Sequence, residues 1–258
     1  MVRKKTVSVV IPVFNEEKTV ANVVRAVLTS EIVSEIICVN DGSVDRSLEI
    51  LKGFGDKIRL INFGNNQGKG AALAAGVRIA GSEIIVFFDA DLIGLKKEHI
   101  VKLTRPLSAN QSSFTLGRLA DFPLIPVLFS GQRAYWKKDL NPYLRKIAQT
   151  RFGVEVFLNY VFREEKRKIV ALKGLNYLRK QKKISSEKVA EAYLDMFKEI
   201  FQVMVDIEKS RFKKVNIKLE EEVSFEELFI KLGKVFEDKD FSRKLRRYFS
   251  FLKNYRLL

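Results

Sequence analysis

Short apolar runs alternate with amphipathic stretches over the N-terminal part of the chain. Runs rich in β-branched side chains predict strands at 7–12, 36–39, 58–63 and 84–88. Between these runs, apolar positions recur at helical spacing, as they do in residues 17–28. Strands that alternate with helices are typical of a parallel, doubly wound sheet, so we expect an α/β fold.

The pattern becomes irregular after residue 105. Residues 164–183 are basic and have helical spacing, and further helical patterns recur over residues 184–258. We therefore expect a main domain over residues 1–183, followed by a helical C-terminal extension. The sequence has no window of about 18 apolar residues, so it predicts no membrane-spanning helix.

Polar residues gather where the expected strands end. Asn15, Asp41, the loop 64–70 and Asp91 each follow an apolar run. Because the carboxyl ends of parallel strands meet at one edge of a sheet, these positions should converge although they are far apart in sequence. The sequence therefore predicts a single ligand site at that edge.

The segment Asp89-Ala90-Asp91 directly follows the apolar run 84–88. Two carboxylates at the end of a buried strand are costly unless a positive charge lies between them. A divalent cation would supply that charge, and a nucleotide diphosphate could share the cation. The alternative interpretation is a strand end with two solvated acids.

The positive charge of the chain is concentrated in blocks. The net charge is +16, and residues 131–183 carry 15 basic and 4 acidic side chains. Residues 241–258 carry 6 basic side chains and no acidic one. Such blocks suit nucleic acid, anionic lipid or phosphorylated substrates, and a solvated charged surface is the alternative. The basic tail could also pair with the acidic stretch 184–240 between the subunits of a homo-oligomer.

Other chemical classes lack the residues that they need. The loop from Gly64 to Lys69 is one residue too short for a Walker-type phosphate loop, and Gly70 stands where Ser or Thr would hold magnesium. His99 is the only histidine, and we expect it to be structural or on the surface, which leaves no zinc cluster and no Ser-His-Asp triad. The single cysteine, Cys38, is expected in the core and indicates a reducing, cytoplasmic compartment.

Four motifs together resemble the family-2 glycosyltransferases with a GT-A fold. They are Val9-Val10-Ile11-Pro12-Val13-Phe14-Asn15-Glu16, Val39-Asn40-Asp41-Gly42-Ser43-Val44-Asp45, Asn66-Gln67-Gly68-Lys69-Gly70-Ala71-Ala72 and Asp89-Ala90-Asp91. The resemblance is strongest over residues 6–105 and is closest to polyprenyl-phosphate sugar synthases, with glucosyl-phosphoglycerate synthases next. It implies a nucleotide-sugar half over residues 1–105 and an acceptor half over residues 106–183.

The resemblance also implies roles for particular residues. Contacts with the nucleotide sugar are implied for Pro12, Phe14, Glu16, Asp41, Lys69, Asp89 and Ala90. Within that set, Asp41 would accept a hydrogen bond from the nucleobase. Asp91 would ligate Mg²⁺ or Mn²⁺, and Asp89 would lie near the ribose or the metal. Asn40 departs from the family, because many relatives carry an aspartate there.

The acceptor half carries further candidates. Arg118, Gln132 and Arg133 are similar to family positions that meet the donor diphosphate or an acceptor phosphate, for which a guanidinium fork is well suited. Glu155 is similar to a later motif in which an acid faces the active site. Exposed arginines and a surface acid are the alternative interpretation. We take Asp91, Arg133 and Glu155 as the candidate catalytic residues.

These expectations lead to a metal-dependent transfer of a sugar to a phosphate-bearing acceptor. A polyprenyl phosphate would supply its own nucleophilic oxygen and need no general base, whereas a hydroxyl acceptor would need a base, for which Glu155 is the candidate. A soluble acceptor such as phosphoglycerate is the alternative within the enzyme hypothesis. A lipid acceptor would place the protein at a membrane as a peripheral protein, with residues 122–129 and the helix at 241–258 at the anionic surface.

A different class of function also fits part of the sequence. The basic block could make the chain a non-catalytic anion- or nucleic-acid-binding module on a degenerate transferase fold. Against this, aromatic residues do not alternate with the basic ones as a stacking platform would require, and the donor motifs are intact. We therefore expect no nucleic-acid partner.

Overall fold

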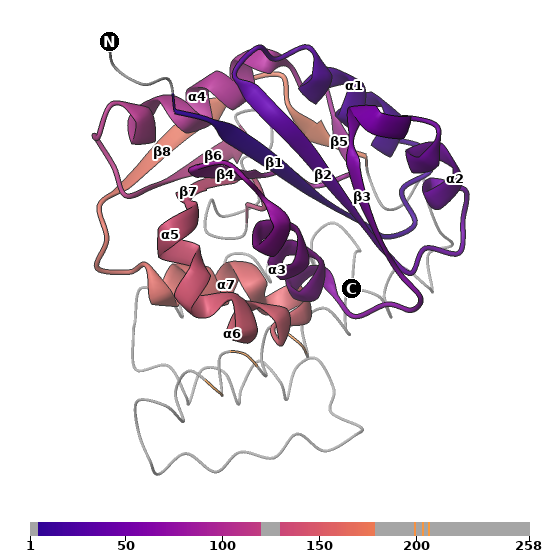
Figure 1. Cartoon of the computed structure of the whole chain (residues 1–258). Helices are drawn as coiled ribbons and strands as arrows, with labels where there is room; N and C mark the ends of the chain where they lie inside the picture. The colour runs from indigo at the N-terminus through magenta and orange to yellow at the C-terminus, as the bar shows by residue number, and fades with distance from the viewer. Residues whose placement is uncertain (1–4, 120–129, 179–198, 200–202, 204–205, 207–258) are drawn as a thin grey trace, which may run out of the picture.

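The protein folds around one seven-stranded sheet in the order β3-β2-β1-β4-β7-β6-β8 (Figure 1). The computed structural model describes residues 5–119, 130–178, 199, 203 and 206. The N-terminal strands pair in parallel and are β1 (Val7–Val13), β2 (Val33–Asp41), β3 (Arg59–Phe63) and β4 (Ile84–Phe87). The expected α/β class and the mostly parallel sheet are confirmed.

The second half of the sheet contains one reversed strand. The strands there are β6 (Phe114–Leu119), β7 (Arg133–Trp136) and β8 (Arg167–Leu172). In this described sheet, β7 runs antiparallel to both of its neighbours, β4 and β6, whereas β6 and β8 are parallel. A separate two-stranded antiparallel sheet joins β5 (Leu92–Ile93) to β9 (Asn176–Tyr177).

Helices cover both faces of the sheet (Figure 1). One face carries α1 (Val20–Leu28), α2 (Ser47–Lys52) and α4 (Lys97–Ser108). The other face carries α3 (Lys69–Ile79), α5 (Lys137–Leu140), α6 (Leu144–Ala148) and α7 (Val154–Val161). Short 3₁₀ turns lie at η1 (Gly55–Lys57), η3 (Asn141–Tyr143) and η4 (Arg151–Gly153).

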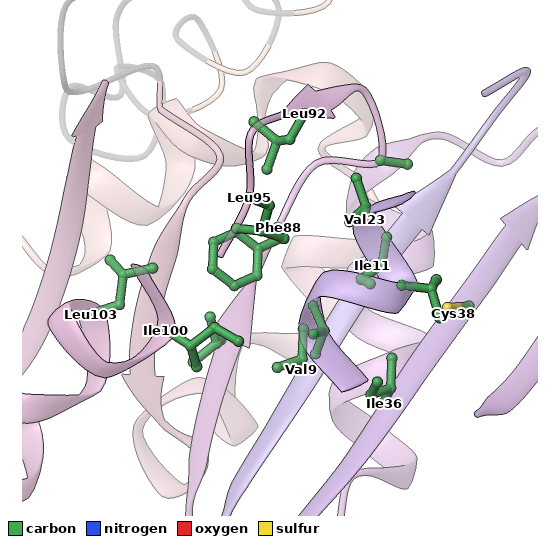
Figure 2. Close-up of a cluster of buried hydrophobic side chains, with 14 of the residues drawn as sticks. Val9, Ile11, Val23, Ile36, Cys38, Phe88, Leu92, Leu95, Ile100 and Leu103 are labelled. Atoms are coloured by element: carbon green, nitrogen blue, oxygen red, sulfur yellow. The ribbon is translucent and has the colours of Figure 1, made fainter. Parts of the chain in front are cut away.

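Alternation along β1 divides its side chains between two apolar cores. Val9 and Ile11 enter the core beneath α1 and α4, which Figure 2 shows, and Val10 enters the core beneath α3. Cys38 is fully buried in the first of these cores, as predicted, and burial raises the pKa of its thiol to about 12. Burying each large apolar side chain contributes about 1.5–3 kcal/mol, so the two cores hold the strand ends in place.

The region after residue 105 differs from the prediction. Residues 164–183 were expected to be helical, and this is wrong for their described part, because β8 and β9 lie there. β8 is at the edge of the sheet and its first three residues are exposed, so its basic side chains reach solvent from a strand. The strands β6 and β7 were not anticipated either.

Several expectations fall outside the described residues. These are the apolar segment 122–129, the helix at 241–258 and almost all of the extension 184–258. Among the described residues, none of the helices has the length and apolar character needed to cross a membrane.

Candidate functional site

The predicted convergence of strand ends is confirmed. Asp41 ends β2, Asp89 follows β4, and the parallel register of both strands with β1 places them at the same edge of the sheet. Lys69 begins α3 at this edge and forms an ion pair with Asp89. The edge therefore brings together polar groups from at least three separate motifs.

The loops after β1 and β2 are joined to each other. Asn15 adopts a left-handed backbone conformation with φ of 55°, and its Oδ1 accepts a hydrogen bond from the backbone N–H of Val44 at 2.9 Å. This arrangement leaves Phe14 exposed and Pro12 and Glu16 partly exposed. All three residues were predicted to contact a nucleotide, and that role stays a prediction.

Asp41 holds the glycine-rich loop. Its carboxylate is buried, and its two oxygens accept hydrogen bonds from the backbone N–H groups of Gln67 and Gly68 at 2.7 and 2.9 Å. Burial raises the pKa of Asp41, and these two hydrogen bonds oppose the rise without cancelling it. The residue predicted to read the nucleobase thus already fixes the chain immediately before Lys69.

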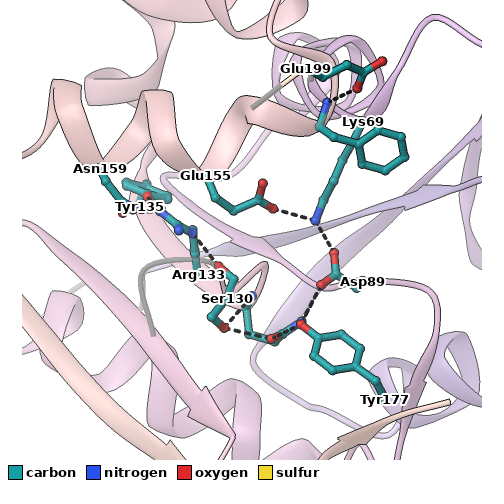
Figure 3. A network of polar contacts seen from close by, with 11 residues as sticks. Lys69, Asp89, Ser130, Arg133, Tyr135, Glu155, Asn159, Tyr177 and Glu199 are labelled. Atoms are coloured by element: carbon teal, nitrogen blue, oxygen red, sulfur yellow. Dashed lines mark hydrogen bonds and ion pairs between the residues drawn. The ribbon is translucent and has the colours of Figure 1, made fainter. Parts of the chain in front are cut away.

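Lys69 lies between two carboxylates. Its Nζ is 2.5 Å from Oδ1 of Asp89 and 2.6 Å from Oε1 of Glu155, so α3, the end of β4 and α7 meet at one ammonium group (Figure 3). The three side chains are 10–18% exposed. Within this trio two negative charges face one positive charge, and the guanidinium of Arg133 lies in the same network (Figure 3).

The ion pairs shift the pKa values of Lys69 and Asp89. Burial alone would lower the pKa of the Lys69 ammonium, but the two carboxylates outweigh it and raise that pKa. Burial alone would raise the pKa of Asp89, but the charge of Lys69 and the hydrogen bonds to the carboxylate lower it. Both groups are therefore charged at neutral pH.

The second oxygen of Asp89 is also engaged. Oδ2 accepts hydrogen bonds from Nε2 of Gln132 at 2.9 Å and from the hydroxyl of Tyr177 at 3.1 Å (Figure 3). Gly131 lies so close that a Cβ there would be 2.3 Å from Oδ2 of Asp89. Gln132 holds Asp89 in this way, and its predicted contact with a phosphate stays a prediction.

Arg133 is enclosed by protein. Its side chain is 1% exposed, Nε donates to the carbonyl of Ser130 at 2.6 Å, and Nη1 donates to Oδ1 of Asn159 at 2.9 Å and the hydroxyl of Tyr135 at 3.2 Å. The predicted contact with a diphosphate would require this guanidinium to become accessible, so it stays a prediction. Arg118 differs, because its side chain on β6 is exposed.

Asp91 is the first candidate metal ligand of the Asp89-Ala90-Asp91 segment. Its side chain is partly exposed, and its backbone carbonyl accepts the N–H of Leu178 at 2.9 Å. The oxygens of Asp89 contact Lys69, Gln132 and Tyr177, and its predicted role as a second ligand stays a prediction. Ala90 packs into the first core, and its predicted contact with the nucleotide sugar stays a prediction.

The donor set fits a cation that is shared with a bound phosphate group. The described residues contain no group of three His, Cys, Asp or Glu side chains that could enclose a metal. Magnesium and manganese need only one or two carboxylates when substrate phosphates supply the other oxygens. One carboxylate at Asp91 is compatible with that kind of site.

Sequence reasoning missed two side chains that complete the site. Tyr177 lies 88 residues after Asp89 and follows no recognisable motif. Asn159 follows Glu155 by one helical turn and points toward Arg133, a signal that helical spacing could have provided. His99 is structural as expected, because its ring accepts the N–H of Lys96 and contacts the carbonyl of Lys173.

Comparisons with known proteins agree with this arrangement. Residues 8–170 match the family described as Glycosyl transferase family 2. A dolichyl-phosphate beta-glucosyltransferase of Trichomonas vaginalis is 39% identical over 94 residues, which is 32% of this chain and 28% of that protein. A poly(ribitol-phosphate) beta-glucosyltransferase of Bacillus spizizenii is 35% identical over 124 residues, covering 44% of this chain and 19% of that protein.

A solved structure supports the fold. Glucosyl-3-phosphoglycerate synthase from Mycobacterium tuberculosis, in complex with Mn²⁺ and UDP-glucose, superposes with a TM-score of 0.62 at 20% identity, covering 82% of this chain and 80% of that chain. The matches to the first curated relatives span less than a third of the length of those relatives.

Proposed function

The chain belongs to glycosyl transferase family 2, and on that basis we propose that it transfers a sugar from a nucleotide-diphosphate sugar to a phosphate-bearing acceptor. One structural observation carries the proposal. The carboxylate of Asp41 holds the loop that leads to Lys69, and Lys69 pairs with Asp89 beside Asp91. The motifs that the family uses for its donor therefore form one continuous set of contacts.

The acceptor that we favour carries its own anionic oxygen. A hydroxyl acceptor needs a base that takes its proton, whereas a phosphate monoester arrives as an anion. Glu155, the candidate base, is engaged with Lys69, whose ammonium donates to Oε1 at 2.6 Å. A polyprenyl phosphate needs no base, and the similarity to a dolichyl-phosphate glucosyltransferase supports it.

Phosphoglycerate is the second candidate acceptor. The structural similarity to glucosyl-3-phosphoglycerate synthase extends over most of both chains. Structures of that protein contain UDP-glucose, Mn²⁺ and phosphoglyceric acid together. By the same comparison, UDP-glucose is our first choice of donor.

Asp91 would hold Mg²⁺ or Mn²⁺ together with the diphosphate of the donor. The bound cation would neutralise charge that develops on the leaving diphosphate. The role of Asp89 is then to fix the segment, because its oxygens are held by Lys69, Gln132 and Tyr177.

A thermal-shift panel tests the donor half of the proposal. We expect a UDP-, GDP- or TDP-sugar to raise the melting temperature only with Mn²⁺, because the diphosphate and Asp91 would share the cation. A ligand at about 100 times its Kd stabilises the folded state by about 2.7 kcal/mol. Asp91→Ala should remove this shift. Asp56→Ala, at an exposed position in η1, is the matched control and should keep it. Salt-sensitive binding to RNA or DNA without any nucleotide-sugar shift would instead favour the non-catalytic module.

Transfer from the labelled donor tests the acceptor. Product should form with a short-chain polyprenyl phosphate presented in anionic vesicles, and the same donor should be offered with phosphoglycerate in solution. Transfer to phosphoglycerate alone would select the second candidate. Transfer to neither, by a protein that binds the donor with metal, would contradict both acceptors.

A further inference from the structure

Tyr177 reaches the candidate site from a distant part of the chain. It belongs to β9, which pairs in antiparallel register with β5, and Leu92 of β5 lies opposite Tyr177. Because Leu92 directly follows Asp91, this pairing places β9 against the Asp89-Ala90-Asp91 segment. The ring of Tyr177 packs against the first apolar core, and its hydroxyl lies among the polar groups (Figure 3).

β9 and the residue that follows it contact both ends of that segment. The hydroxyl of Tyr177 is 3.1 Å from Oδ2 of Asp89 and 3.1 Å from Oε1 of Gln132. The next residue, Leu178, donates its backbone N–H to the carbonyl of Asp91 at 2.9 Å. One contact fixes a side chain and the other fixes the backbone, so the orientation of the segment depends on β9.

We propose that Tyr177 is a positioning residue, which holds the Asp89-Ala90-Asp91 segment so that Asp91 faces a divalent cation and a nucleotide diphosphate. The inference rests on the proposed function, and it assigns to Tyr177 no contact with substrate. The hydroxyl acts through Asp89, whose Oδ2 it shares with Gln132.

The chemistry of the hydroxyl suits this task. Burial, together with the neighbouring Asp89 and Asp91, raises the pKa of Tyr177, so the phenol keeps its proton and remains a donor at neutral pH. A phenylalanine would fill the same space against the core and lack only the hydrogen bond. Tyr177→Phe therefore separates positioning from packing.

The test measures how much Mn²⁺ is needed for nucleotide binding. Bound Mn²⁺ and bound nucleotide are followed in the intact chain by electron paramagnetic resonance and calorimetry, with the nucleotide diphosphate selected by the donor panel. We expect Tyr177→Phe to raise the Mn²⁺ concentration at half-saturation about tenfold, as loss of a group that orients a metal ligand does. The melting temperature without metal should change little.

Tyr143→Phe is the matched control. The ring of Tyr143 packs against Phe157 and Phe162, and its hydroxyl has no hydrogen-bond partner in the described part of the chain. This variant should leave the Mn²⁺ requirement unchanged. In addition, Tyr177→Phe should have no further effect in an Asp89→Ala background, because the hydroxyl then has no acceptor at residue 89 to position.

The outcomes separate the two claims. If the wild-type chain binds Mn²⁺ and nucleotide but Tyr177→Phe behaves like Tyr143→Phe, the positioning role is overturned and the proposed function stands. A loss of melting temperature with an unchanged Mn²⁺ requirement also overturns the positioning role, because it shows a structural contribution alone. If the wild-type chain shows no metal-dependent nucleotide binding, the proposed function fails and the inference fails with it.

Discussion

Two polar clusters lie at opposite ends of the same parallel strands. At the amino ends, Glu35 on β2 accepts hydrogen bonds from Ser8 on β1, Arg59 on β3 and the backbone N–H of Gly81 before β4. At the carboxyl ends, Lys69 pairs with Asp89 and Glu155. We call these the Glu35 cluster and the Lys69 cluster.

The clusters differ in charge balance and in exposure. In the Glu35 cluster one carboxylate meets one guanidinium, and the Arg59 side chain is 50% exposed. In the Lys69 cluster two carboxylates share one ammonium that is 18% exposed. The partly solvated Glu35 pair joins strands, whereas the enclosed ion pairs of Lys69 hold the groups of the candidate site in place. The cluster at the amino ends of the strands therefore has a structural role, whereas the cluster at the carboxyl ends belongs to the candidate site.

Removing the positively charged side chain should lower the free energy of unfolding much more in the Lys69 cluster than in the Glu35 cluster. Lys69→Met leaves two enclosed carboxylates without a counter-charge, and breaking a buried ion pair in this way costs about 3–5 kcal/mol. The free energy of unfolding from urea titrations at neutral pH checks this value. Arg59→Met is the matched control, and its partly solvated pair should cost no more than about 1 kcal/mol. Equal losses in the two variants would contradict the distinction between the clusters.

A methyl group added beside Asp89 should destabilise the protein more than one added beside Glu35. At Gly131 a Cβ would be 2.3 Å from Oδ2 of Asp89, so Gly131→Ala must displace that carboxylate. We expect a loss of about 1–3 kcal/mol in stability and weaker metal-dependent nucleotide binding. At Gly81 a Cβ would be 3.4 Å from Oε1 of Glu35, which is an ordinary contact. The free energy of unfolding of Gly81→Ala should stay within about 0.5 kcal/mol of the wild type, and this variant should bind nucleotide normally. A larger loss of stability and nucleotide binding in Gly81→Ala than in Gly131→Ala would contradict the distinction between the two clusters.

Acid should weaken the Glu35 cluster, and this is the smallest of the three expected effects. Burial would raise the pKa of Glu35, but hydrogen bonds from Ser8, Arg59 and Gly81 together lower it below the usual 4.5. A carboxyl group whose pKa is lowered by folding stabilises the folded state at any pH above the pKa of the unfolded state. That stabilisation is lost as the pH falls through the pKa of the folded state. Glu35→Gln should therefore cost about 1 kcal/mol at neutral pH, and its stability should fall less than that of the wild type between about pH 5 and pH 3.

Urea unfolding at several pH values checks this expectation. Glu31→Gln, at an exposed position, is the control and should follow the wild type. A parallel decline of wild type and Glu35→Gln throughout the acid range would show that Glu35 carries none of the acid sensitivity.

Much of the first half was predictable because its signals are local. Continuous apolar runs indicated the parallel strands, and their parallel order predicted that Asp41, the loop 64–70 and Asp91 converge at one edge of the sheet. The second half depends on contacts between distant segments. The basic stretch around β8 has helical spacing, yet pairing with β6 at the sheet edge makes it a strand.

The contacts that individual residues make at the site were less predictable than which residues lie there. Asp41, Gln132 and Arg133 were all expected to face a ligand. In the structure both oxygens of Asp41 bind a loop, Gln132 binds Asp89 and Arg133 is enclosed, while the predicted ligand contacts of all three stay predictions. Such partners follow from tertiary packing, because a residue type states which hydrogen bonds it can make but not which group supplies them.

The reversed direction of β7 has a consequence for how this protein can tolerate change. Because β7 runs antiparallel to β4, Arg133 at the start of β7 lies opposite Phe87 at the end of β4. The residues that lead into β7 therefore face those that follow β4. A two-residue slip along β7 would carry Gln132 about 7 Å away from Asp89, and a one-residue slip would turn its side chain to the other side of the sheet. Insertions and deletions within β7 should therefore be selected against more strongly than substitutions there, even where the apolar character of the strand is kept.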